Sequence, residues 1–327
     1  MNKSTIVAGL VACAIGCSSD GGGSLTPTQF QQQEASAYCT YYVRCGLYAD
    51  QASCLANANT TPDSAVFDAI NAGKVTWNGG DAQSCLDAIE SLSCDQTSMG
   101  ARVEPSACLN IVTGVAATGS ACEQDAECVS GECALTTCGS ACCPGTCTGS
   151  ASTGAVGEPC IEGDTCAAGN WCDESDTGSI CQALVASGSA CQASASCPYG
   201  QGCGGGICKV LPQVGQPCPD NVCADIGAYC GSAGTCLAYG LSGAACGSGT
   251  ECSPFETCDT TSGKCAALPT VGQPCTDECS NATCDNGTCV APGSDGTTCM
   301  FPSDCQSDNC VIDENGSGTC TAESVCI

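Results

Sequence analysis

The chain has 327 residues, of which 40 are cysteine and only 4% are aromatic. So much cysteine marks a disulfide scaffold made in an oxidising compartment, and so few large apolar side chains cannot fill two ordinary cores. The formal net charge of −28 excludes a surface that binds nucleic acid or is drawn to anionic membranes.

Residues 1–16 are predicted to be a secretory signal peptide. Their apolar stretch, from Ile6 to Ile15, is too short to cross a bilayer, which needs about 20 residues. It ends in Ala14-Ile15-Gly16-Cys17, which resembles the bacterial lipoprotein box, whose cysteine receives a lipid. Leu10-Val11-Ala12-Cys13 also fits the box. Cleavage before Cys17 leaves 38 of the 40 cysteines to pair, whereas cleavage before Cys13 leaves an odd number.

Residues 17–24 are expected to form a flexible tether, because Ser18 to Ser24 are polar and rich in glycine. Serines behind a lipidated cysteine are similar to those of Gram-negative lipoproteins that go to the outer membrane. The resemblance implies anchoring in the cell outer membrane, facing the extracellular side or the periplasm. The membrane is thus the first expected partner, through the lipid on Cys17.

Residues 25–115 are predicted to form an all-α domain. The helix start and stop signals are Thr26-Pro27, Asp50, Thr61-Pro62, Gly73 and Asp81. Apolar residues recur at spacings of three, four and seven behind these starts, which gives each helix one buried face.

The cysteines of this domain are expected to link its helices. Cys39 and Cys45 fall on one helix, about 120° and 9 Å apart, so they cannot bond to each other. Each must reach a different element, which predicts three cross-links among six cysteines. The tyrosines of the same helix, Tyr38, Tyr41 and Tyr42, allow a binding face, but core is the favoured interpretation in a small domain.

Residues 119–327 are predicted to be an array of about seven repeats. A Gly-x-x-Cys phrase opens each unit, at Gly119, Gly157, Gly188, Gly215, Gly243, Gly272 and Gly296. Three more cysteines follow, and tight glycine turns such as Asn286-Gly287 precede the fourth. Each unit is expected to be a small β-hairpin held by two disulfides. Four cysteines allow three pairings, so the connectivity stays open.

Units two to six are regular, with four cysteines each. The cysteines expected to pair within them are Cys160, Cys166, Cys172, Cys181, Cys191, Cys197, Cys203, Cys208, Cys218, Cys223, Cys230, Cys236, Cys246, Cys252, Cys258, Cys265, Cys275, Cys279, Cys284 and Cys289. An aromatic residue before the third cysteine, Trp171 or Tyr229, is expected to lie over a disulfide in place of a core.

The two end units carry additional cysteines. Unit one adds Cys138, Cys142 and Cys143, and unit seven adds Cys326, the best candidate for a free or intermolecular thiol.

Unit one carries a family resemblance. Cys122-Glu-Gln-Asp-Ala-Glu-Cys128, the glycine turn to Cys133 and Cys142-Cys143-Pro144-Gly145-Thr146-Cys147 resemble the Dickkopf N-terminal cysteine-rich region. The later units look like degenerate copies of it, over about residues 119–326. With its helical domain and lipoprotein box, the chain is similar to cysteine-rich surface lipoproteins of myxobacterial type. The resemblance implies a secreted disulfide module, not signalling through animal receptors.

The sequence contains no recognisable catalytic constellation. It has no histidine, no C-x-x-C spacing and no phosphate-binding glycine motif, so we expect neither an enzyme nor a cofactor. One weak calcium candidate is Asp313, Asn315 and Ser317, which matches the opening of a calcium loop. The acidic twelfth ligand is missing, and an Asn315-Gly316 hairpin turn is the favoured interpretation.

These observations predict a small disulfide-rich fold, with an N-terminal all-α domain followed by an array of β-hairpin repeats. The function favoured by repetition is a lipid-anchored adhesive or structural stalk that binds cell surfaces, matrix or itself. Units in line would reach on the order of 100 Å, since a short hairpin is roughly 15–20 Å long. The alternative is a surface-displayed binder or inhibitor of a soluble ligand or protein, with or without calcium.

Overall fold

The structure, a computed structural model, describes most of the helical domain and of the array. The described residues are 24–58, 64–95, 105, 107–135, 144–149, 154–160, 166–167, 169–175, 178–198, 200–247, 249–276, 278–300, 304–306, 310–312 and 318–321. Among them, no helix combines the length and the apolar character that crossing a membrane requires.

The N-terminal module contains the predicted helices. They are α1 (Pro27–Arg44), α2 (Gln51–Asn57), α3 (Ser64–Asn71) and α4 (Gly79–Glu90). Thr26 and Gln29 form a reciprocal capping box at the start of α1, and Asp50 accepts the Ser53 N–H at 2.8 Å to start α2. Gly73 has φ +71° beyond the end of α3, as a stop signal should. The Thr61-Pro62 start lies outside the described residues.

The predicted cap at Asp81 is wrong. α4 begins three residues earlier, behind Asn78, whose side-chain oxygen accepts the Asp81 N–H at 3.4 Å. Asp81 lies in the first turn instead, where a carboxylate is favoured by the positive end of the helix dipole. Asn and Asp are about equally good caps, so local cap preference does not distinguish Asn78 from Asp81.

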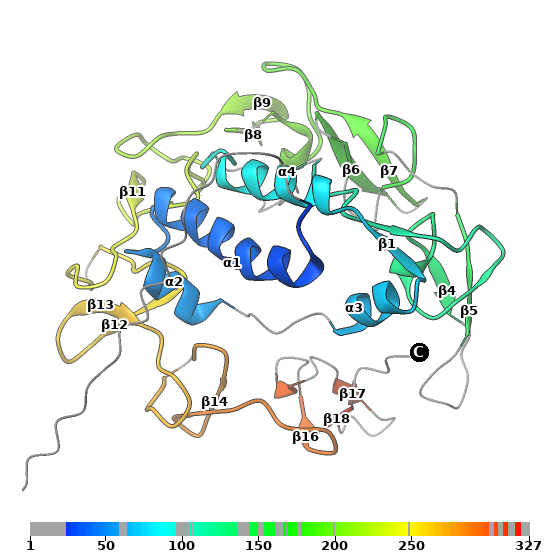
Figure 1. Ribbon diagram of the computed structural model, residues 1–327. Helices are drawn as coiled ribbons and strands as arrows, with labels where there is room; N and C mark the ends of the chain where they lie inside the picture. The colour runs from blue at the N-terminus through cyan, green and yellow to red at the C-terminus, as the bar shows by residue number, and fades with distance from the viewer. Residues whose placement is uncertain are drawn as a thin grey trace, which may run out of the picture.

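The module is not purely helical. Strand β1 (Val75–Trp77) pairs antiparallel with β2 (Val112–Gly114), and the Trp77 indole N–H donates to the Leu25 carbonyl at 2.7 Å. The sheet joins the end of the domain to its middle, and the indole hydrogen bond joins the middle to the beginning. The α1 and α4 helices lie side by side (Figure 1) and share an apolar core that includes Phe30, Leu86 and Ile89.

Three disulfides link the elements of the module, as predicted. Cys39 bonds to Cys54 on α2, Cys45 to Cys94 beyond α4, and Cys85 on α4 to Cys108. The two cysteines at positions 39 and 45 thus reach different partners.

The array repeats one pattern of disulfides seven times. In each unit, with the additional cysteines of unit one left out of the numbering, the first cysteine bonds to the third and the second to the fourth. The pairs are 122–133 and 128–147, 160–172 and 166–181, 191–203 and 197–208, 218–230 and 223–236, 246–258 and 252–265, 275–284 and 279–289, and 299–310 and 305–320.

Each disulfide pair holds a small antiparallel sheet. Units two to six are hairpins: β6 (Asn170–Ser175) with β7 (Gly178–Ala183), β8 (Gln201–Gly204) with β9 (Ile207–Val210), β10 (Ala228–Cys230) with β11 (Cys236–Ala238), β12 (Glu256–Asp259) with β13 (Lys264–Ala267), and β14 (Thr283–Asp285) with β15 (Thr288–Val290). Units one and seven add a short third strand. In unit one, β5 (Gly145–Cys147) lies between β3 (Ala121–Cys122) and β4 (Cys133–Leu135). In unit seven, β18 (Gly318–Cys320) lies between β16 (Thr298–Cys299) and β17 (Cys310–Ile312).

The opening glycine has the same role in all seven units. Its φ lies between +79° and +87°, a conformation that side-chain-bearing residues rarely adopt. Its N–H donates to the carbonyl of the fourth cysteine at 2.7–2.9 Å, and that cysteine's N–H returns to the residue after the glycine. The start of each unit is therefore fastened to its end, which explains why Gly-x-x-Cys recurs.

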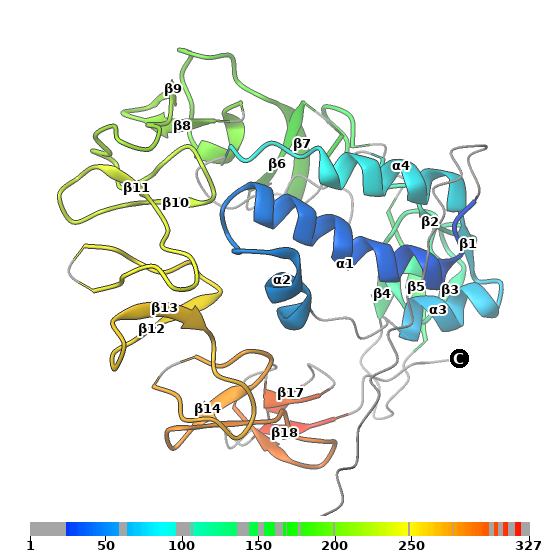
Figure 2. The same cartoon turned by 60° about the vertical axis from the view of Figure 1, so that its left-hand side comes forward.

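The expected in-line rod is wrong. The units follow an arc around the helices, from unit one beside β1 and α3, along α4, past the α2 end and back (Figures 1 and 2). Phe255 of unit five stacks on Tyr48 with ring centroids 4.7 Å apart, and the Ile226 N–H of unit four donates to the Cys94 carbonyl at 2.9 Å. The large apolar residues of these units have no core of their own, so they are buried against the helices.

Candidate functional site

Several predicted sites lie outside the described residues. They are the lipidation site Cys17, the additional cysteines Cys138, Cys142, Cys143 and Cys326, and the calcium candidate Asp313, Asn315 and Ser317. They stay predictions.

The tyrosine stripe of α1 belongs to the packing of the domain. Tyr42 contacts Tyr48 and Phe255, with ring centroids 6.4 and 6.0 Å apart, and Tyr41 donates its hydroxyl to the Ser93 carbonyl at 3.2 Å. Tyr38 packs against the apolar core. The core interpretation is confirmed, and the stripe is not an open binding face.

Tyr229 is the aromatic residue before the third cysteine of unit four. It is buried, stacks on Tyr239 at 5.1 Å, donates its hydroxyl to the Gly249 carbonyl and accepts the Glu251 N–H, both at 2.9 Å. The ring thus joins unit four to unit five. Trp171, at the same position in unit two, is half-buried.

The opening turns divide the units into two kinds. Even-numbered units have valine directly before the glycine, at Val156, Val214 and Val271, and these side chains are 56%, 48% and 54% exposed. Odd-numbered units have Thr118, Ser187, Ser242 and Asp295 at the same place. A proline also precedes the first cysteine in even units only, at Pro159, Pro217 and Pro274, and all three are exposed.

These turns are held rigid without help from a partner. In every unit the residue after the glycine donates its N–H to the carbonyl three residues earlier, at 2.8–3.0 Å. In units four and six, the side chains of Gln216 and Gln273 also accept the N–H of Gln213 and Thr270, at 2.9 and 2.8 Å. Because the turn is already fixed, an exposed apolar group on it binds without a loss of backbone conformational entropy.

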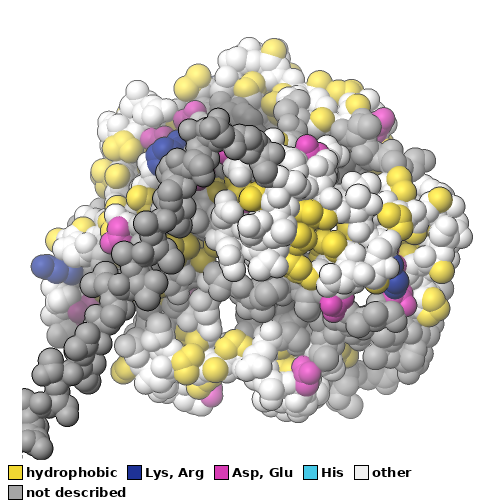
Figure 3. All heavy atoms as spheres, viewed as in Figure 1, with side chains coloured by type: hydrophobic (Ala, Val, Ile, Leu, Met, Phe, Trp, Pro, Cys, Tyr) yellow, Lys and Arg dark blue, Asp and Glu magenta, His cyan; other side chains and the backbone are white. Residues whose placement is uncertain are grey.

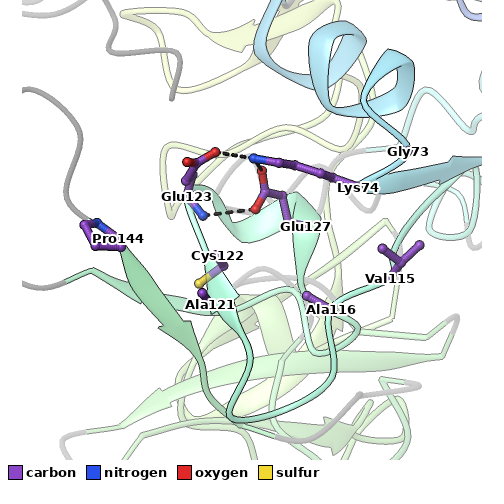
Figure 4. A pocket seen from close by; sticks show the side chains of 9 residues that line it. All are labelled: Gly73, Lys74, Val115, Ala116, Ala121, Cys122, Glu123, Glu127 and Pro144. Atoms are coloured by element: carbon purple, nitrogen blue, oxygen red, sulfur yellow. Dashed lines mark hydrogen bonds and ion pairs between the residues drawn. The ribbon is translucent and has the colours of Figure 1, made fainter. Parts of the chain in front are cut away.

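A cavity of about 320 Å³ lies where the helical module meets unit one (Figure 4). Its apolar walls are Val115, Ala116, Ala121 and Pro144. A charged group closes one end: Lys74, which follows α3, and Glu123 and Glu127 of unit one. Glu127 lies on the short 3₁₀ helix Asp125–Glu127 and is only 4% exposed.

The three charged side chains bind one another. The Lys74 ammonium contacts the Glu123 carboxylate and lies 3.1 Å from Glu127 Oε1, while Glu127 Oε2 accepts the Glu123 N–H at 3.0 Å. The hydrogen bond to Glu123, with a further contribution from Glu127, raises the pKa of Lys74 above its usual value. The lysine is therefore charged at neutral pH, and the cluster carries one more negative charge than positive.

The surface around these sites has few cations. Lys and Arg together number 6 against 34 acidic residues. On the face seen in Figure 3, the few cationic side chains lie apart from one another. The surface therefore favours cationic groups over anionic ones.

One comparison with known proteins finds a match. The model of the Dickkopf N-terminal cysteine-rich region matches residues 159–209. No curated protein and no solved structure matches the chain. The chain contains cysteine-rich repeats, and the region 159–209 is similar to the Dickkopf cysteine-rich region. The matched residues cover units two and three, from Cys160 to Cys208, and the Cys142-Cys143-Pro144-Gly145 run of unit one lies outside them.

Proposed function

We propose that this chain is a lipid-anchored surface protein without enzymatic activity, and that it binds a partner through the exposed turns of its even-numbered units. The anchor is the lipid on Cys17 in the outer membrane, supported by the lipoprotein box and by cysteine parity. Of the two functions considered from sequence, the surface-displayed binder now has more support than the stalk, because an array bent around the helices gives little reach.

The observation that carries the proposal is the repetition of one exposed apolar turn. Single exposed valines are ordinary on protein surfaces. Here Val156, Val214 and Val271 occupy one position in three rigid turns, and the odd-numbered units have small polar residues or aspartate there. A cell surface or an assembly of identical subunits presents the same group many times. Three weak contacts from one chain to such a partner give a higher overall affinity than any one of them.

The binding proposal is tested on the whole mature chain with Cys17→Ser, so that the lipid is absent. The fluorescent protein is added to intact cells that lack their own copy, and binding is measured by flow cytometry. We expect saturable binding that falls at least tenfold in the triple variant Val156→Ser, Val214→Ser, Val271→Ser. Serine already stands at this position in units three and five, so the fold should tolerate it.

The matched control is Thr118→Ala, Ser187→Ala, Ser242→Ala, which changes the same turn position in odd-numbered units. It should bind as the parent does. Absence of saturable binding, or equal loss in both triple variants, would contradict the proposal. The anchor is tested by incorporation of an alkyne fatty acid into the full-length chain, which Cys17→Ser should abolish.

A further inference from the structure

The cavity at unit one extends beyond the ion pairs that close one of its ends. The Lys74 cluster joins the helical module to unit one of the array. A structural role in this contact is enough to account for the charged residues. It does not explain the open space of about 320 Å³ beside them, which is large enough for a small ligand or a side chain. Figure 4 shows that space between Pro144 on one side and Val115 on the other, below the charged group.

One carboxylate of the cluster is partly exposed, although Lys74 contacts it. Both oxygens of Glu127 are engaged, one by Lys74 and one by the Glu123 N–H, and its side chain is buried. Glu123 shares Lys74 with Glu127, and its side chain is 30% exposed. One ammonium against two carboxylates leaves a net negative charge at this end of the cavity, and Glu123 is where a ligand can reach it.

The cavity walls restrict the ligand further. Val115, Ala116, Ala121 and Pro144 offer no side-chain donor or acceptor, so they suit methylene groups. A divalent cation is disfavoured because it needs several oxygen ligands, and Lys74 and the Glu123 N–H already engage both oxygens of Glu127 and one of Glu123. An ammonium group carries a single charge and needs only one acceptor oxygen. An anionic ligand would have to displace Glu123 against the field of a chain with net charge −28.

We infer that this cavity binds a primary ammonium group on a short aliphatic stem, the chemistry of a lysine side chain or of a small free alkylamine. The ammonium would lie at Glu123, with the stem between Val115 and Pro144. This inference rests on the proposed binding function, because it names a group that the partner would present. Lys74 then has a positioning role: it holds both carboxylates at the cavity end.

The test is an NMR titration of the whole lipid-free mature chain with pentylamine. We expect saturable shifts at the amides of Lys74, Val115 and Glu123, and none with pentanol or pentanoate, which have the same stem. Glu123→Gln keeps a partner for Lys74 but removes the charge, and should weaken binding at least tenfold. Ala121→Leu fills the cavity without changing any charge and should weaken binding to a similar extent.

The control is Asp295→Asn, which removes one exposed carboxylate from the opening turn of unit seven and should leave pentylamine binding unchanged. Shifts that spread over the acidic surface without saturation, or equal losses in Glu123→Gln and Asp295→Asn, would overturn the inference and leave nonspecific attraction of cations. A second arm uses lysine with both backbone ends blocked. If it binds like pentylamine, the site accepts a partner's side chain; if only pentylamine binds, the site takes free amines.

Failure here is distinguishable from failure of the proposed function. Cell binding that depends on Val156, Val214 and Val271 but is unaffected by Glu123→Gln would keep the turns as the binding surface and exclude the cavity.

Discussion

The helical module and the repeat array meet the same shortage of large apolar side chains in different ways. The module concentrates its share in one core, where Ile89 is fully buried and Phe30 packs edge-on against Trp77 at 5.5 Å. The buried clusters of unit one and unit seven consist of cysteine. In the module the disulfides add to an apolar core, whereas in these units of the array the disulfides themselves fill the interior.

The junction between the two regions follows from this difference. Units four and five have bulky apolar residues, Ile226, Tyr239 and Phe255, that their small sheets cannot cover. These residues join Tyr48 and Leu47 of the module in one cluster. Close contact requires Gly227 as well, because a β-carbon there would come within 1.9 Å of the Cys45 carbonyl oxygen. The module thus supplies the core that part of the array lacks.

The largest contrast is expected when one disulfide is removed from each region. Each bond contributes about 2–4 kcal/mol. Replacing Cys252 and Cys265 by alanine should loosen the opening turn of unit five, because the Gly243 N–H bonds to the carbonyl of Cys265, while Phe255 keeps its contact with the helices. Replacing Cys85 and Cys108 should leave α4 folded on its apolar core. Hydrogen exchange measures both, at the Gly243 N–H, which bonds to the carbonyl of residue 265 at 2.8 Å, and at the amides of α4.

In the first variant the Gly243 amide should lose its protection, while in the second the α4 amides should keep most of theirs. Protection of the Gly243 amide without the Cys252–Cys265 bond would mean that the contacts of unit five with the helices hold its opening turn without this disulfide.

A smaller effect is expected at the junction. Phe255→Ala removes a half-buried ring that stacks on Tyr48 and contacts Tyr42, and should cost about 2 kcal/mol, less than a fully buried phenylalanine. The disulfides of each unit remain, so the units should stay folded while units four to six separate from the helices. Small-angle scattering should show a radius of gyration near the compact value of about 20 Å for the parent and a larger one for the variant.

Val210→Ala is the control for this change, because Val210 is 71% exposed and lies on the hairpin of unit three. It should alter neither the stability nor the radius. An unchanged radius in Phe255→Ala would mean that the remaining contacts, such as the hydrogen bond of Ser253 to the Leu47 carbonyl, hold the arc without the ring.

The local features of the molecule were predictable from the sequence. The capping box at Thr26 and the turn at Asn286-Gly287, where both residues have positive φ, depend on neighbours within a few positions. The opening glycines were recognisable because one backbone requirement produces the same phrase seven times. The separation of Cys39 from Cys45 followed from helix geometry alone.

The non-local features were not predictable in the same way. The pairing of first with third and second with fourth cysteine depends on how each sheet folds, and all three pairings satisfy the sequence. The arc depends on Phe255 meeting Tyr48, 207 positions earlier in the chain. The cavity at unit one depends on Lys74 meeting Glu123 and Glu127. A signal for the junction was present, since Phe255 is one of only four phenylalanines.

The smallest predicted effect is a pH dependence confined to the junction. Burial, and next the charge of Asp95, raises the pKa of Asp225 in unit four. Burial also raises the pKa of Glu256 in unit five, although the Ser242 N–H that its carboxylate accepts at 3.1 Å opposes this. A carboxyl group whose pKa is raised on folding stabilises the fold most below its unfolded pKa of about 4, and this contribution is lost as the pH rises through the folded pKa.

The junction should therefore become more stable as the pH falls from 7 through the raised pKa values of these two carboxyl groups. Turn hydrogen bonds lower the pKa of Asp50 and Asp259, so the contributions of these two groups are lost only below about pH 4. The contribution of the Lys74 contact is lost only as the pH rises above the ordinary lysine pKa of about 10, through the raised pKa of the folded state. Asp225→Asn with Glu256→Gln should be more stable than the parent at pH 7 and nearly independent of pH between 5 and 7. Thermal unfolding of the parent and of the double variant across this range measures the difference in stability. A parent that loses stability on acidification to pH 5 would show that the junction carboxylates do not govern the pH dependence of stability.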